Sequence, residues 1–149
     1  MAGLSVLQIA GSGLTAQRLR MDVTASNIAN AEATRTQNGG PYRRESVVFT
    51  PRQANGGFRL MGTGLGRSPA AIGTGVQVQA IVQDNTPPRE VLDPNHPDAN
   101  ADGYVAYPNV DLVTEMTDML SASRAYEANV TMINVAKNMA QRALDIGRL

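Results

Sequence analysis

The chain has 149 residues, with 13 basic and 13 acidic side chains, one histidine and no cysteine. Its length corresponds to about one domain, and its zero net charge argues against binding nucleic acid or an acidic membrane through bulk electrostatics. The lack of cysteine excludes disulfides, thiolate metal sites and cysteine nucleophiles, and an aromatic content of 4% predicts no single large core.

The N-terminal segment, residues 1–34, lacks proline and is predicted to be helical. Apolar side chains recur every seven residues on one stripe, at Leu7, Leu14, Met21 and Ile28. The neighbouring stripe is small or polar, as in half a coiled coil, and comprises Leu4, Gly11, Arg18 and Ala25. The segment has neither a basic leader region nor about 18 consecutive apolar residues. We therefore expect a soluble chain with no cleaved signal peptide and no bilayer-spanning segment.

The middle of the chain, residues 35–108, holds all eight prolines and most of the glycines. Alternating polar and apolar residues predict strands over 42–50 and 76–83, and weaker patterns suggest strands over 58–61 and 89–93. Residues 51–75 are rich in glycine and are expected to form a loop that orders only against a partner.

The C-terminal segment, residues 109–149, again lacks proline and has a longer helical pattern. Its seam alternates by four and three residues, through Leu112, Met116, Met119, Ser123, Tyr126, Val130, Ile133, Lys137, Ala140 and Leu144. A further set widens this stripe, namely Leu120, Ala136, Met139, Ala143 and Ile146. Asn109 is expected to cap the start of the helix, and Gly147 is expected to end it.

Charge is unevenly distributed although its total is zero. Residues 31–68 carry six arginines against Glu32 and Glu45, whereas residues 81–118 carry eight acids against Arg89 alone. Two interpretations remain open: the charges are solvated faces or neutralise each other within one chain, or they give copies of the chain head-to-tail complementarity.

Four residues match the start of an EF-hand calcium loop, D-x-N-x-D-G: Asp98, Asn100, Asp102 and Gly103. The twelfth position is Asn109 instead of a bidentate glutamate, and Pro94 and Pro97 stand where the entering helix should be. We expect a turn in which Asp and Asn side chains cap their own backbone. A soluble calcium-binding adaptor built on residues 98–103 is the alternative function.

No constellation for catalysis is found in the sequence. His96 is the only histidine and lies near Asp93 and Asp98, but no nucleophile or oxyanion site stands beside it. No phosphate-binding loop of either common type fits, because the only lysine is Lys137 and the glycine spacing fails. We therefore predict no enzyme, no metal site and no cofactor; an enzyme using His96 is a weak rival.

These patterns predict a mainly α-helical fold with a small β-rich insert. The two helical ends, residues 1–34 and 109–149, pair in a coiled-coil-like manner, and residues 35–108 form the insert. Pairing them leaves the second apolar stripe of the C-terminal helix uncovered. An open, head-to-tail contact with other subunits would bury that stripe and generate a helical array.

Four segments closely resemble bacterial flagellar basal-body rod proteins: residues 12–36 (SGLTAQRLRMDVTASNIANAEATRT), 39–49 (GGPYRRESVVF), 93–111 (DPNHPDANADGYVAYPNVD) and 123–147 (SRAYEANVTMINVAKNMAQRALDIG). The tetrad NIAN, Asn27 to Asn30, is similar to the whole rod and hook family, whereas HPDANADGYVAYPNV is narrower and resembles the short proximal-rod subunits. Leu92 departs from this pattern where an aromatic residue is expected, and Asn95 where glycine is common.

The resemblance implies a non-enzymatic structural subunit of the flagellar proximal rod. Such subunits polymerise with other rod proteins into a hollow drive shaft that transmits torque and passes exported proteins. Their paired terminal helices form an inner domain lining the channel, and the insert lies outside it. The implied location is the flagellar basal body in the periplasm, reached through the flagellar type III export apparatus. The implied partners are copies of the chain, other rod proteins and neighbouring basal-body components, and the helical ends fold on assembly.

The resemblance also implies roles for individual residues. Side chains expected in helix and subunit packing are Leu7, Leu14, Met21, Asn27, Ile28, Asn30, Leu112, Met116, Met119, Leu120, Tyr126, Val130, Ile133 and Leu144. Among them, Asn27 and Asn30 are expected to terminate or fix the first helix. A loop at the junction of the insert and the last helix is expected to use Asp93, His96, Asp98, Asp102, Gly103, Tyr104 and Tyr107.

Overall fold

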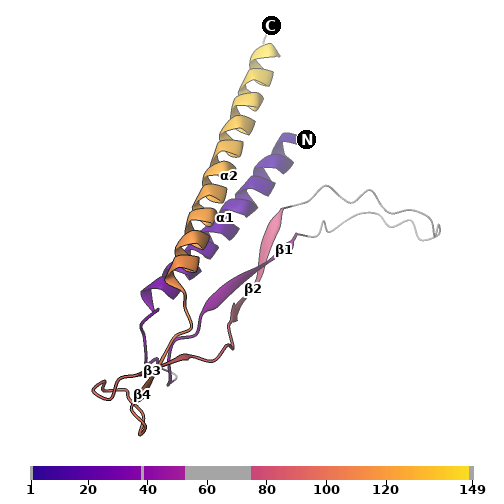
Figure 1. Ribbon diagram of the computed structural model, residues 1–149. Helices are drawn as coiled ribbons and strands as arrows, with labels where there is room; N and C mark the ends of the chain where they lie inside the picture. Colours follow the sequence, from indigo (N-terminus) through magenta and orange to yellow (C-terminus); the bar gives the residue numbers. More distant parts are fainter. Residues whose placement is uncertain (1, 38, 53–74, 148–149) are drawn as a thin grey trace, which may run out of the picture.

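The fold is a long antiparallel helix pair with two small β-hairpins at one side and one end (Figure 1). This computed structural model describes residues 2–37, 39–52 and 75–147. Helix α1 spans Ala2–Ala29 and helix α2 spans Leu112–Ile146. The mainly helical fold class predicted from the sequence is confirmed. Neither helix among the described residues combines the length and hydropathy that crossing a bilayer requires.

Four strands form two separate two-stranded antiparallel sheets. Strand β1, Glu45–Pro51, pairs with β2, Val76–Gln83, and the register is interrupted by an irregularity between Val48 and Phe49. Strand β3, Arg89–Leu92, pairs with β4, Tyr104–Tyr107. The β1–β2 hairpin lies along α1, whereas the β3–β4 hairpin lies beyond the ends of the helices (Figure 1).

Three of the four predicted strands are present, because period-two alternation is a reliable mark of a half-buried strand. Strands β1, β2 and β3 correspond to the predicted segments 42–50, 76–83 and 89–93, and segment 58–61 lies outside the described residues, as does most of the predicted loop 51–75. Strand β4 was not predicted, because it lies between Gly103 and Pro108 in a segment interpreted as a turn-rich loop.

The core is thin and is built mainly from small and polar side chains. Its buried members in the described chain are Ala10, Ala16, Val23, Val105, Pro108 and Ala122 with Thr24, Asn27 and Glu115. At Gly13 the helices approach closely, because a Cβ added there would lie 3.0 Å from the Asn129 side chain. The low aromatic content of the sequence therefore corresponds to a core packed with small side chains and a glycine contact instead of bulky side chains.

The ends of α2 correct one expectation and confirm another. Asp111, not Asn109, caps the start: its carboxylate accepts from the Val113 backbone N–H at 3.0 Å and from the Thr114 hydroxyl at 2.8 Å. Asn109 lies two residues too early, directly after Pro108, and Asp at the N-cap also carries the charge that a helix N-terminus favours. Gly147 ends the helix as predicted, with its N–H donating to Ala143.

The Asp111 cap predicts a pH-dependent stability. The Thr114 hydroxyl, and then the Val113 N–H, hold the pKa of the Asp111 carboxyl below its ordinary value. Because folding lowers this pKa, the carboxylate stabilises the chain above the pKa of the unfolded state, about 3.9, and this contribution is lost as pH falls through the lowered value. Asp111→Ala should therefore melt at a lower temperature than the parent at pH 7, and the gap should close in acid. Melting curves across pH test this, with Asp145→Ala as control; a gap independent of pH would contradict it.

Candidate functional site

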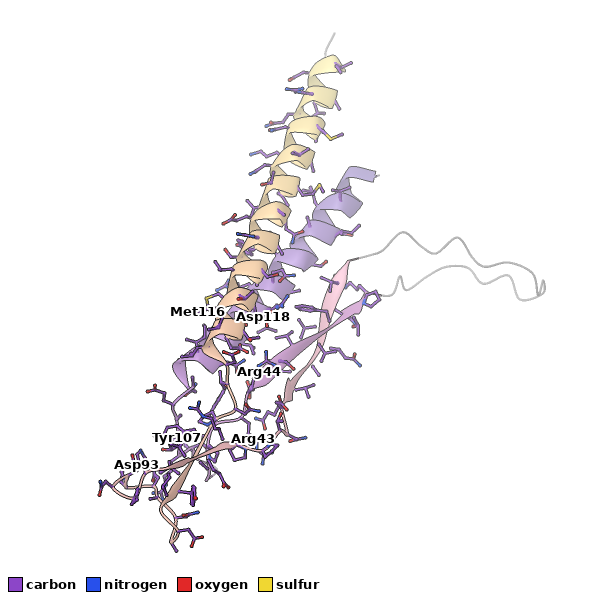
Figure 2. The ribbon with its side chains drawn as sticks, viewed as in Figure 1. Arg43, Arg44, Asp93, Tyr107, Met116 and Asp118 are labelled. Carbon is purple, nitrogen blue, oxygen red and sulfur yellow. The ribbon has the colours of Figure 1, made fainter. Side chains whose placement is uncertain are left out.

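A network of polar and charged side chains ties three segments together where α1, β1 and α2 meet. We call it the polar junction and define it by Arg20, Asn27, Arg44, Glu115 and Asp118. Asn27 and Glu115 are each only 1% exposed. Figure 2 shows Arg44 and Asp118 lying together beside the first turns of α2. Buried polar groups at this density require full pairing, so the contacts define the geometry closely.

Asn27 binds the start of β1 as a neighbouring strand would. Its Nδ2 donates to the carbonyl of Glu45 at 2.8 Å, and its Oδ1 accepts from the N–H of the same residue at 2.9 Å. The same amide donates to Glu115 Oε2 at 3.0 Å and accepts from the Tyr42 hydroxyl at 3.0 Å. Only a side chain with both donor and acceptor can do this, which explains asparagine here.

The charges of the polar junction balance within it. Arg44 Nε donates to Glu115 Oε1 at 2.6 Å, and the Arg44 guanidinium also lies 3.7 Å from Asp118. Asp118 in turn accepts from Arg20 of α1 at 2.8 Å. Two arginines thus face two carboxylates in a chain of contacts that joins both helices to the insert. This arrangement has no unpaired charge to offer a ligand or a reaction.

Sequence reasoning identified Asn27 but missed the rest of the polar junction. Arg44 and Glu115 are 71 residues apart in sequence, and such a pairing leaves no local pattern. One signal was available: Glu115, Met119, Ala122 and Tyr126 follow the four-three spacing of a helix face. The side of α2 toward α1 follows this register, since Glu115 and Ala122 are the residues of α2 that are buried.

The predicted packing residues divide into three groups in the single chain, of which the first is the buried Asn27 alone. Half-buried are Leu14, Met21, Ile28, Asn30, Met119, Tyr126 and Ile133. Exposed are Leu7, Leu112, Met116, Leu120, Val130 and Leu144. Asn30 follows the last residue of α1 and donates from its side chain to the Ser26 carbonyl at 2.8 Å. Met116 lies 56% exposed and Leu144 70% exposed, so α2 presents apolar side chains that nothing within the described chain covers.

The predicted loop residues lie together around the β3–β4 hairpin. His96 meets Tyr107 edge-on at a ring separation of 6.2 Å and accepts at Nδ1 from the Asp98 N–H. The Asp98 carboxylate accepts from Thr34 at 2.8 Å, which attaches the loop to the segment that follows α1. Gly103 adopts a φ of +79° at the turn into β4. Asp93, Asp102 and Tyr104 complete this region, and Tyr104 is exposed.

The residues matching an EF-hand are already engaged in the hairpin. Asn100 Oδ1 accepts from the backbone N–H groups of Asp102 and Tyr104, and the Asp98 carboxylate is held by Thr34. Within the described ranges no group of three His, Cys, Asp or Glu side chains is placed to hold a metal ion. The hydrogen bonds of Asn100 and Asp98 are those of a structural turn in which Asx side chains cap the backbone.

Comparisons with known proteins match nearly the whole chain. Residues 7–35 match the family described as flagella basal body rod protein, and residues 101–146 match the C-terminal family of flagellar basal body rod FlgEFG proteins. The flagellar basal-body rod protein FlgC of Borreliella burgdorferi is 46% identical over 95% of both chains. FlgC of Bacillus subtilis is 44% identical, and that of Escherichia coli O157:H7 42% identical, each over 99% of this chain and 100% of the relative.

Proposed function

This chain belongs to the family of flagellar basal-body rod proteins, and from that membership we propose how it acts as a rod subunit. As a rod protein it is a non-enzymatic, structural component of the motility apparatus, and membership in the family implies assembly with other rod proteins. We assign it to the proximal part of the rod, where copies polymerise with other rod subunits into a hollow shaft that transmits torque and passes exported proteins.

The observation that supports this role is the uncovered apolar face of α2. Leu112, Met116 and Leu120 follow one another at turns of the helix, all exposed, beside a helix pair with a thin core. Side chains of this kind gain about 25 cal/mol per Å² of apolar surface when a neighbouring subunit covers them. Nothing in the described part of one chain covers these side chains, so we expect neighbouring subunits to bury them in the assembled rod.

We also propose that different segments of the chain form an inner and an outer domain of the rod. Residues 1–34 and 109–149 form the inner, channel-lining domain, and residues 35–108 form the outer insert. The position of the β1–β2 hairpin along α1 supports this division, because it places that hairpin on one side of the helix pair, while the β3–β4 hairpin lies beyond the helix ends. The predicted packing residues, including Leu14 and Ile133, would then serve contacts within the inner layer.

The proposed location is the basal body in the periplasm, reached through the flagellar type III export apparatus. A narrow export route requires the chain to unfold, and a core with few large apolar side chains offers less resistance to unfolding than a bulky one. We propose copies of this chain, other rod proteins and neighbouring basal-body components as its partners.

Introducing charge on the apolar face of α2 should block assembly. The variant Met116→Asp/Leu120→Asp should keep the fold of the single chain, because both side chains are exposed. Its incorporation into rods should fall at least about tenfold, since burying two unpaired carboxylates costs far more than 1.4 kcal/mol. Quantifying the subunit in purified basal bodies, and in the exported fraction, tests this.

A matched control carries the same two charges elsewhere on the helix. Thr117→Asp/Ser121→Asp changes exposed polar positions on a different side of α2 and should incorporate normally. Equal incorporation of the two variants would refute the assignment of the apolar face to subunit packing.

A further inference from the structure

The β1–β2 hairpin is attached to α1 at two well-separated points. At its base, Asn27 holds the backbone of Glu45 through both a donor and an acceptor. At its far end, the Ser12 hydroxyl accepts from the Val76 N–H at 3.1 Å while donating to the Ile9 carbonyl at 2.7 Å. Fifteen helical residues separate Asn27 from Ser12, which corresponds to about 22 Å along the helix axis. An element held at two such points cannot pivot about either one.

The far attachment leaves no room for an intervening side chain. Gly75, which precedes β2, has a φ of +109°, and a Cβ built on it would collide with the Ser12 hydroxyl. Glycine therefore satisfies two demands at this position, a left-handed backbone and direct contact between the hairpin and the helix. The attachment joins the hairpin backbone to a short side chain that is itself bonded to the backbone of α1, so its geometry is fixed more tightly than a contact between long side chains.

At its base, the hairpin is linked through the polar junction to both α1 and α2. Arg20 of α1 and Arg44 of the insert both bind Asp118 of α2, so each pair of the three segments shares a direct link. Glu115 adds a second link from α2 to Arg44 and another to Asn27. Because α1, α2 and the hairpin are each linked to the other two, none of them can rotate freely against its neighbours at this point. Apart from the 3.7 Å ion pair of Arg44 with Asp118, these contacts are hydrogen bonds of 2.6–3.0 Å, which are directional and unlike the sliding contact of apolar faces.

We propose that the polar junction and the Ser12–Val76 contact together form a rigid clamp that carries shear between the inner helix pair and the outer β1–β2 hairpin. This inference rests on the proposed role in a torque-transmitting rod and adds to it which residues keep the two layers from turning past each other. Arg20, Asn27, Arg44, Glu115 and Asp118 act as positioning residues, and Ser12 is the second anchor.

A mild double variant loosens the clamp without leaving a buried charge unpaired. Ser12→Ala removes the acceptor for the Val76 N–H, and Asp118→Asn weakens both arginine contacts of a side chain that is 35% exposed. The control Ser121→Ala/Asp22→Asn makes the same two chemical changes at exposed positions. Glu115 and Asn27 stay unchanged, so both variants are expected to fold.

The first test measures the distance between hairpin and helix in the purified chain. Because the chain has no cysteine, spin labels placed at Gln79→Cys and Glu127→Cys are the only two in the molecule. The parent and the control should each give a single narrow distribution of label-to-label distances. The clamp variant should give a distribution about twofold wider, because its hairpin can turn about the one attachment that remains. A distribution as narrow in the clamp variant as in the parent would overturn the proposal.

The second test applies load to assembled flagella. Cells with the clamp variant should build rods in normal number and swim normally in dilute medium, and should lose swimming speed relative to the control as viscosity rises. Equal speeds at every viscosity would overturn the clamp while leaving the chain a rod subunit. Rods that fail to form would also contradict it, because the clamp is assigned to torque and not to assembly. Absence of the parent chain from rods would instead refute the proposed function.

Discussion

Replacing Glu115 by alanine should destabilise the chain by about 3–5 kcal/mol, the cost of breaking a buried ion pair by removing one partner. The glutamate is 1% exposed and accepts from Arg44 at 2.6 Å and from Asn27 at 3.0 Å. Its removal leaves a guanidinium and an amide facing a cavity. Small domains have only about 5–15 kcal/mol of stability, so this loss should remove a large share of the free energy of unfolding.

Urea denaturation followed by circular dichroism measures this loss. Glu115→Gln keeps an acceptor for Arg44 and should lose less than the alanine variant, because only the charge is removed. Glu127→Ala removes an exposed glutamate from the same helix and should stay within about 0.5 kcal/mol of the parent. A Glu115→Ala chain as stable as the Glu127→Ala control would show that the polar junction does not hold the fold.

Replacing Gly13 by leucine should destabilise the chain by about 1–3 kcal/mol or more, because it forces the two helices apart. A Cβ at Gly13 already meets the Asn129 amide at 3.0 Å, and three further heavy atoms have no space. The neighbouring glycine provides a matched comparison, since a Cβ at Gly11 meets nothing within 4 Å. Gly11→Ala should therefore stabilise the chain by about 0.5–1 kcal/mol through helix propensity.

Thermal melting tests both substitutions, because they should shift the melting temperature in opposite directions. For a chain of this size, each kcal/mol shifts the midpoint by about 2–4 °C, so Gly13→Leu should melt lower than the parent and Gly11→Ala higher. The double variant Gly13→Leu/Asn129→Ala should recover part of the loss, because it removes the side chain that the leucine meets. A Gly13→Leu chain that melts with the parent would show that the helices are not in close contact at that position.

The helices and most strands could be predicted because their patterns are local. Heptad spacing in residues 7–28 and the valine–glutamine alternation in 76–83 are each complete within one element. The start of α2 was placed at Asn109, whereas Asp111 caps it, because Asn and Asp two residues apart are equally good candidates until the chain direction after Pro108 is known.

The polar junction could not be predicted, because its partners come from segments far apart in sequence. Asn27 was identified within the NIAN tetrad, but nothing local distinguishes Arg44 from Arg43, or Glu115 from the other acids of its segment. Arg43 binds Asn85 at the surface, whereas Arg44 turns inward. The predicted seam of α2 also includes Leu112 and Met116, which are exposed in the single chain, because apolar residues occupy more of the circumference of α2 than one partner helix can cover.

Because of the exposed apolar side chains of α2, the stability of the folded chain should depend on protein concentration. Leu112, Met116, Leu120 and Leu144 contribute little to folding in a lone molecule, since water surrounds them. A ligand that binds only the folded state stabilises it by mass action, and for this chain a neighbouring subunit is such a ligand. The midpoint of melting should therefore rise with protein concentration, and a subunit that leaves the polymer should be the form that proteases remove.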